Sequence, residues 1–174
     1  MGWFKKSKPT TWLEEVRQVT ARVMEEIDEA RKMLAKNEAF DPRNGRHLKL
    51  ARTIMTLATN IPETRGADAR SAGWSEAKYP PFTVSSWSGS LEGRFSHSQR
   101  IFYQGQLVFD WVSEAGWEEE FRVVRFGSWC YELFDIVRKV RREVEASALE
   151  SQTETERRAA EFEANRFKPF EPDK

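Results

Sequence analysis

The segment RIFYQGQLVFDWV, residues 100–112, decides the fold of this chain. On either side of Gly105 the residues fall into two interleaved sets, one of which holds Ile101, Tyr103, Leu107, Phe109 and Trp111. A period of two is typical of β-strands, and a glycine between two such runs allows the backbone conformation of a tight hairpin turn. The segment therefore predicts an antiparallel β-hairpin.

Shorter runs with the same period lie on both sides of this hairpin. They are FTVSSWS at 82–88, GRFSHS at 93–98 and EEFRVVRF at 119–126. Antiparallel sheets commonly have one face covered and the other partly in water. We expect a meander of four or five antiparallel strands with helices on one face. The segment 62–81 before these strands is irregular, and whether it is functional stays open.

Two helices are predicted before the sheet. Thr11 stands three residues before Glu14, which is the spacing of a capping box at a helix start. An apolar series with a mean step of about 3.7 residues follows, comprising Trp12, Val16, Val19, Val23, Ile27, Ala30 and Leu34. A second helix is expected between Asp41, its cap, and Pro62, and two helices joined by a short loop usually pair antiparallel.

A long helix is predicted after the sheet. It begins near Ser128, and its apolar stripe steps by three and four residues through Cys130, Leu133, Val137, Val140 and Val144. The predicted fold class is α+β, with an N-terminal helical hairpin, an antiparallel meander and a long C-terminal helix. We assign a flexible leader to residues 1–9, a single α+β domain to 10–150, and a projecting charged helix and tail to 151–174.

The composition restricts the class of protein. The 174 residues carry 28 basic and 28 acidic side chains, whereas dedicated nucleic-acid binders usually have a basic excess. A single cysteine forms no intramolecular disulfide, and the sequence shows neither a secretory apolar region nor an apolar run of about 18 residues. We therefore expect a cytoplasmic protein that makes no membrane contact. The sequence contains neither a glycine-rich motif that would bind phosphate nor a residue spacing that is typical of metal ligands. We therefore predict no cofactor and no metal.

A thiol enzyme centred on Cys130 is one alternative hypothesis. A thiol in the first turn of a helix lies where the helix N-terminus favours the thiolate, and His97 is its candidate base. Cys130 is also in register with Leu133 and Val137, and a free cysteine on an apolar stripe behaves as a small hydrophobic residue. The register favours a core position for Cys130 over a catalytic one.

A nucleic-acid-associated protein is the other alternative. Its phosphate contacts would come from a basic cluster comprising Arg122, Arg125, Arg138, Lys139, Arg141 and Arg142. Phe102, Tyr103 and Trp111 would then stack against bases. Because the net charge is zero, a solvated helix face is the favoured interpretation of the cluster. The acidic run 118–120 is interpreted in the same way, as a charged strand edge.

The leading hypothesis is a non-enzymatic protein–protein interaction module, such as a regulator, an inhibitor or an assembly subunit. The first and last helices carry more amphipathic length than a small sheet can cover, and an exposed apolar stripe is usually buried against a partner. The expected partner is another protein or a second copy of the chain. The candidate interaction residues are Trp12, Val16, Val23, Ile27, Phe102 and Trp111.

Overall fold

A computed structural model describes residues 11–34, 38–62, 73–91, 94–114 and 119–166 of the chain. The predicted leader at 1–9, the end of the predicted tail and residues 63–72, half of the segment 62–81, lie outside these ranges. The chain divides into two compact units. We call residues 23–140 the α/β unit, and residues 1–22 together with 141–174 the helical unit.

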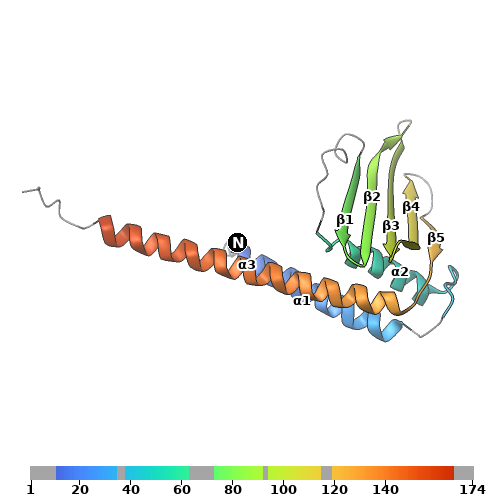
Figure 1. The fold of residues 1–174 in the computed structure, drawn as a ribbon, viewed down its shortest axis with the longest axis horizontal. Helices are drawn as coiled ribbons and strands as arrows, with labels where there is room; N and C mark the ends of the chain where they lie inside the picture. Colours follow the sequence, from blue (N-terminus) through green and yellow to red (C-terminus); the bar gives the residue numbers. More distant parts are fainter. Residues whose placement is uncertain (1–10, 35–37, 63–72, 92–93, 115–118, 167–174) are drawn as a thin grey trace, which may run out of the picture. The chain divides into compact units, whose positions relative to one another are not determined.

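The α/β unit contains a five-stranded antiparallel sheet in the order β1-β2-β3-β4-β5 (Figure 1). The strands are β1 (Trp74–Tyr79), β2 (Phe82–Leu91), β3 (Arg94–Tyr103), β4 (Gln106–Glu114) and β5 (Glu120–Val124). This arrangement confirms the predicted α+β class and the meander. Strand β1 lies in the segment 62–81, where the sequence showed no regular pattern.

The hairpin predicted at residues 100–112 is formed by β3 and β4. Its turn consists of Gln104 at φ 50° and Gly105 at φ 78°, so both central residues have positive φ, as in a type I′ turn. This turn twists in the same sense as the strands it joins, which explains why the two-residue connection suffices. Ile101 pairs with Phe109 across the two strands, and both side chains are fully buried.

The described residues also form three helices: α1 (Trp12–Met33), α2 (Gly45–Ala58) and α3 (Ser128–Arg166). The capping box is present at the start of α1, where the Thr11 N–H donates to Glu14 Oε2 at 2.9 Å and the Glu14 N–H donates to Thr11 Oγ1 at 3.2 Å. The predicted cap of α2 is wrong by three residues. Asn44, not Asp41, accepts the N–H of Arg46 at 3.0 Å, while the Asp41 carboxylate accepts the N–H of Arg43 in the preceding turn.

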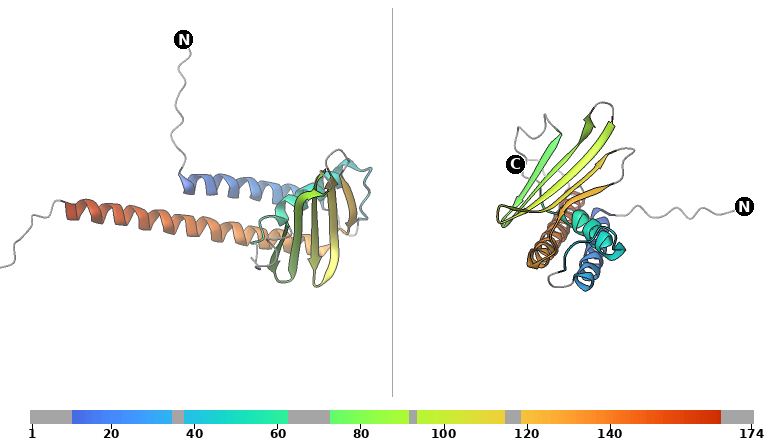
Figure 2. Two further views of the ribbon diagram at one scale, coloured as in Figure 1. Left: turned by 90° about the horizontal axis from the view of Figure 1, so that it is seen from above. Right: turned by 90° about the vertical axis from the view of Figure 1, so that its right-hand side faces the viewer.

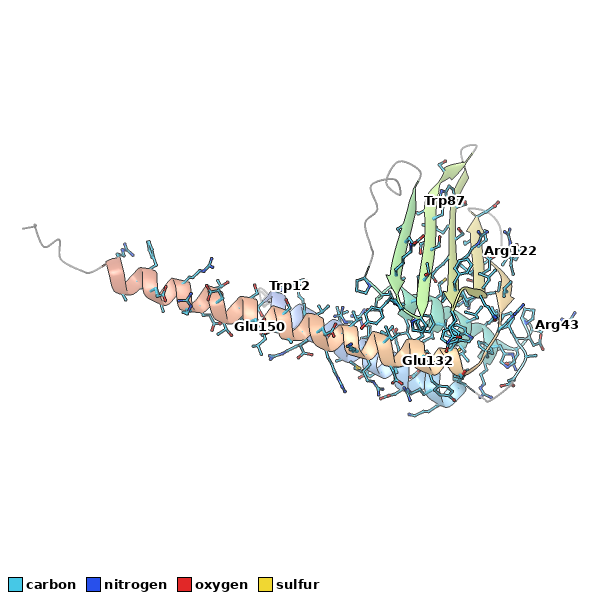
Figure 3. The ribbon with its side chains drawn as sticks, in the orientation of Figure 1. Trp12, Arg43, Trp87, Arg122, Glu132 and Glu150 are labelled. Atoms are coloured by element: carbon cyan, nitrogen blue, oxygen red, sulfur yellow. The ribbon has the colours of Figure 1, made fainter. Side chains whose placement is uncertain are left out.

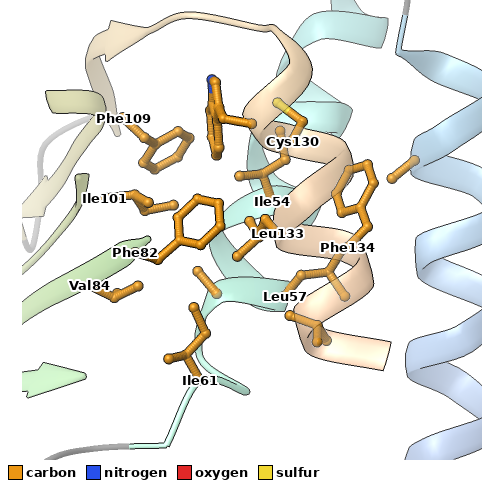
Figure 4. Packing of buried hydrophobic residues seen from close by; sticks show 14 of the residues in the cluster. Ile54, Leu57, Ile61, Phe82, Val84, Ile101, Phe109, Cys130, Leu133 and Phe134 are labelled. Carbon is orange, nitrogen blue, oxygen red and sulfur yellow. The ribbon is translucent and has the colours of Figure 1, made fainter. Parts of the chain in front are cut away.

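In the α/β unit the helices lie on one face of the sheet (Figure 2). The core between them is formed by Phe82, Val84, Ile101 and Phe109 from the strands, Ile54, Leu57 and Ile61 from α2 and the residues after it, and Cys130, Leu133 and Phe134 from α3 (Figure 4). These helices cover the end of the sheet that holds the β1–β2 and β3–β4 turns (Figure 1). The other ends of the strands extend past them.

The buried stripe of α1 differs from the predicted one at two positions. Leu13 and Thr20 are buried, whereas Trp12 and Val19 are exposed. The observed stripe steps alternately by three and four residues, through Leu13, Val16, Thr20, Val23, Ile27, Ala30 and Leu34. A mean step of about 3.5 residues is the pattern of a helix that packs along one other helix. That other helix is α3. The hydropathy of α1 does not show which of its faces meets α3, so the sequence prediction selected Trp12 and Val19 in place of Leu13 and Thr20.

In the helical unit, α1 and α3 run antiparallel. Arg17 forms an ion pair with Glu145 at 3.3 Å, and Arg141 Nη2 donates to Thr20 Oγ1 at 3.2 Å. Leu13 and Val16 form a small apolar cluster with Val144 and Ala148. The polar Thr20–Arg141 pair lies within this contact between α1 and α3, which we call the seam. A buried polar pair of this kind favours one register of two helices over others.

Candidate functional site

The pairing register places three rows of side chains on the helix-facing side of the sheet. The first row, Val84, Ile101 and Phe109, belongs to the core. Because side chains alternate along a strand, the residues two positions further on share this face. They form a second row of Ser86, Gln99 and Trp111 and a third row of Ser88, His97 and Ser113. The sheet therefore changes from apolar to polar where the helices stop covering it.

A groove of about 390 Å³ opens at this change, between the C-terminal end of α2 and strands β2 to β4. It is lined by Met55, Thr56, Thr59, Ser86, Trp87, Ser88, His97, Ser98, Gln99 and Trp111. Ligand pockets in proteins typically measure about 300–1,000 Å³, so this groove has the size of a site for a small molecule. Figure 3 shows Trp87 on the part of the sheet that extends past the helices.

The Trp111 ring is held in place from outside the groove. Its Nε1–H donates to Glu119 Oε2 at 3.3 Å, and the same carboxylate forms an ion pair with Arg52 of α2. A carboxylate that bridges a helix and an indole restricts the rotation of that indole. Glu119 thus has a positioning role, which the sequence prediction of a solvated acidic edge did not include.

Gln99 is the most buried polar residue of the groove. Only 5% of its surface is exposed, and its Oε1 has no hydrogen-bond partner among the described residues. His97, two residues earlier on β3, is exposed and pairs with Ser88 and Ser113 on the neighbouring strands. The groove therefore combines an aromatic wall, hydroxyl groups and a buried amide.

Cys130 does not line the groove that contains His97. The thiol is fully buried in the core of the α/β unit, where burial raises its pKa to about 12. The thiol-enzyme hypothesis depended on stabilisation of the thiolate by the helix N-terminus. In the folded protein the loss of water around the buried thiol outweighs that stabilisation. At neutral pH the group is a protonated thiol that packs as a small apolar side chain.

The buried thiol predicts a loss of stability in alkaline solution. The ordinary pKa of the thiol is 9.0 and its pKa in the folded protein is about 12, so its contribution is fully present below pH 9 and is lost as the pH rises towards 12. We expect the free energy of unfolding to fall by about 1.4 kcal/mol per pH unit across this interval. Denaturant titrations at pH 8 and at pH 10.5 measure the change, and Cys130→Ala should remove this part of it. An equal fall in both proteins would contradict the prediction.

The basic cluster is largely engaged within the chain. In the α/β unit, Arg138 forms an ion pair with Asp28 at 2.9 Å, Arg122 pairs with Glu120 at 3.0 Å, and Lys139 Nζ lies 6.0 Å from the centre of the Tyr79 ring. In the helical unit, Arg141 is bonded to Thr20 and to the carbonyl oxygen of Val16. Of the six basic residues, Arg125 and Arg142 are exposed with no such contact described.

The candidate interaction residues separate into two groups. Val16, Val23 and Ile27 are buried by the chain itself, so their side chains are already covered. Phe102 and Trp111 are half-buried on the sheet, and Trp12 is exposed on α1. Figure 3 shows Trp12 near the start of α1 and Glu150, which follows the exposed Leu149, on α3.

His47 is a buried histidine in the first turn of α2. The Asp41 N–H donates to its Nδ1 at 2.9 Å, and its Nε2 lies 3.1 Å from Glu38 Oε1. The rings of Phe40 and Phe126 pack against the imidazole. These contacts give His47 a structural role at the start of α2.

Comparison of the chain with protein-family models, with curated proteins and with solved structures finds no match. Within the described ranges, no group of three His, Cys, Asp or Glu side chains is placed to hold a metal ion. Along the same part of the chain, none of the helices is both long and apolar enough to cross a membrane.

Proposed function

We propose that this chain is a non-enzymatic protein–protein interaction module, an assembly subunit that pairs with a second copy of itself through its helical unit. One observation carries the proposal. Among the described residues, the large hydrophobic side chains that remain exposed are Trp12 at 64%, Val19 at 40%, Leu149 at 47% and Phe162 at 69%, and all four belong to the helical unit. Exposed apolar groups concentrated in one region mark an interaction surface.

The spacing of these residues suits a helical partner. Trp12 and Val19 are seven residues apart and therefore lie on one face of α1. Leu149 lies at the same level as Trp12, because its neighbour Ala148 packs with Leu13 in the apolar cluster. Two exposed positions on one helix and one on its antiparallel neighbour form a surface that two copies can bury in a four-helix arrangement.

A second copy is the favoured occupant because no net charge opposes its approach. The formal net charge of the chain is zero, so two copies do not repel each other at long range. Arg17 and Glu145 are already paired within the unit, as are Glu154 and Arg157 further along α3. Association then depends on apolar contact between identical surfaces, as in a two-fold dimer. The proposal places this dimer in the cytoplasm, where a free thiol such as Cys130 stays reduced.

Sedimentation equilibrium of the full chain tests this proposal. We expect a mass of twice 20.3 kDa that is independent of salt, and dissociation on dilution. The double variant Trp12→Glu, Val19→Glu should weaken association by roughly 100-fold or more, because each change places a carboxylate in an apolar interface.

Gln18→Glu is the control for charge, since Gln18 is exposed on the same helix and the substitution adds one carboxylate, as does each of the two changes in the double variant. It should leave the dissociation constant within about twofold. A monomer at every concentration up to the millimolar range would overturn the proposal, as would a double variant that associates like the unchanged chain.

A further inference from the structure

The groove between α2 and the sheet differs from the rest of the surface in charge. None of its ten lining residues is an acid, a lysine or an arginine, although such residues make up 32% of the chain. A charged ligand would lose water there without gaining an opposite charge, which is unfavourable. The lining therefore selects an uncharged occupant.

The buried amide of Gln99 indicates what this occupant offers. A buried polar atom without a hydrogen bond is destabilising, so Oε1 of Gln99 is a site at which a donor would be stabilising. Rotation of the terminal amide exchanges its N–H₂ and C=O groups at little steric cost. A ligand that carries a donor and an acceptor side by side can therefore pair with both groups of Gln99.

The aromatic part of the lining indicates the shape of the occupant. Trp111 stands next to Gln99 on the paired strand, and the hydrogen bond from its Nε1 to Glu119 fixes its ring in the absence of any ligand. A ring that is already fixed loses little conformational entropy when a flat molecule packs against it. Stacking of a planar base on an aromatic side chain is favourable for every base, because each base has a flat π face.

We propose that this groove binds an uncharged, flat ring that carries an N–H donor beside a C=O acceptor, the lactam edge found in pyrimidine and purine bases. The ring packs against Trp111, and its lactam edge pairs with the Gln99 amide. The groove lies wholly in the α/β unit, so this site is independent of the self-association proposed for the helical unit.

Titration of the ¹⁵N-labelled full chain with uracil, uridine and hypoxanthine, followed by NMR, tests the site. We expect saturable shifts at Gln99 and at the Trp111 indole. The matched ligand 3-methyluridine keeps the ring but lacks the N–H donor, so it should bind at least about tenfold more weakly. Absence of saturable shifts with all three lactams would overturn the proposal, as would equal binding of uridine and 3-methyluridine.

Gln99→Met separates binding from structure, because it keeps the length of the side chain and removes the amide. We expect lactam binding to fall by about tenfold or more while the denaturation midpoint stays the same or rises, since an unpaired buried amide is removed. Gln106→Met, at an exposed position at the start of β4, is the control and should change neither quantity. A clear loss of stability in Gln99→Met would show that the amide is structural and would overturn the proposal.

A ten-residue oligouridine distinguishes the two sources of such a ring. If the biological ligand is a free base or nucleoside, the oligomer binds no more tightly per site than uridine, and salt has little effect. If the base belongs to a single strand, binding is tighter and weakens as salt is raised, because phosphate contacts release counterions. Either result supports the lactam site and identifies the source of its ligand.

Discussion

Replacing Phe134 by alanine is expected to lower the free energy of unfolding by about 3–5 kcal/mol, a large fraction of the total for a domain of this size. Phe134 is fully buried, and its ring meets that of Tyr131 edge-on with 6.4 Å between the centroids. Figure 4 places the ring between α3 and the part of α1 that belongs to the α/β unit. Its removal would leave a cavity that three helices and a sheet cannot close without moving, and the remaining core atoms would lose their contacts.

Phe162→Ala is the matched control, because it is the same substitution on the same helix at a side chain that is 69% exposed. Both variants are compared at concentrations at which the chain is monomeric, so that self-association does not contribute to either value. We expect it to change the free energy of unfolding by less than about 0.5 kcal/mol. Urea titrations of both variants, monitored by tryptophan fluorescence, measure the two values. Similar losses in both variants would contradict the prediction that the Phe134 side chain of α3 is part of the core of the α/β unit.

The elements that were predictable from sequence are those whose signal is local. The hairpin at residues 100–112 follows from alternation and from Gly105, and the start of α1 follows from the spacing of Thr11 and Glu14. Both features involve residues within a few positions of each other. Strand β1 was missed because the residues from Trp74 to Tyr79 become regular only by pairing with β2.

The errors on α1 have a non-local cause. Trp12 and Val19 are more apolar than Thr20, so hydropathy assigns them to the buried face. The buried face is instead decided by α3, from which Arg141 reaches Thr20 and makes a polar residue acceptable in the seam. The register of two helices that are more than a hundred residues apart in the chain is not visible in either segment alone.

The groove was only partly predictable for a similar reason. His97 was recognised as the candidate base of the thiol-enzyme hypothesis. Trp111 was recognised as a candidate residue of the interaction and nucleic-acid hypotheses. Ser86 and Gln99 were not, because polar residues within a strand are ordinarily assigned to its solvent face. The register of β2, β3 and β4 places them on the same side as Ile101. A polar residue at an inward position of an otherwise alternating strand is the sequence signal that would have identified Gln99.

Gly73→Ala is expected to lower the free energy of unfolding by about 2–5 kcal/mol. Gly73 has φ +73°, and a Cβ atom there would lie 2.8 Å from the carbonyl oxygen of Ser88 and 3.3 Å from Nε1 of Trp87. The carbonyl belongs to β2, and the Ser88 N–H donates to Gly73 O at 3.1 Å, so neither backbone can move without weakening the pairing of β1 with β2. Backbone strain and overpacking therefore add at this position.

Gly105→Ala isolates the first of these two costs. Gly105 has φ +78°, close to that of Gly73, but a Cβ atom there would meet nothing within 4 Å. We expect a loss of only about 1–2 kcal/mol from the unfavourable backbone conformation. The entropy that alanine removes from the unfolded chain is the same in both variants and cancels in the comparison. Thermal and urea unfolding of the two variants should thus differ by the cost of the contact with Ser88, and equal losses would show that β1 does not approach β2 so closely at Gly73.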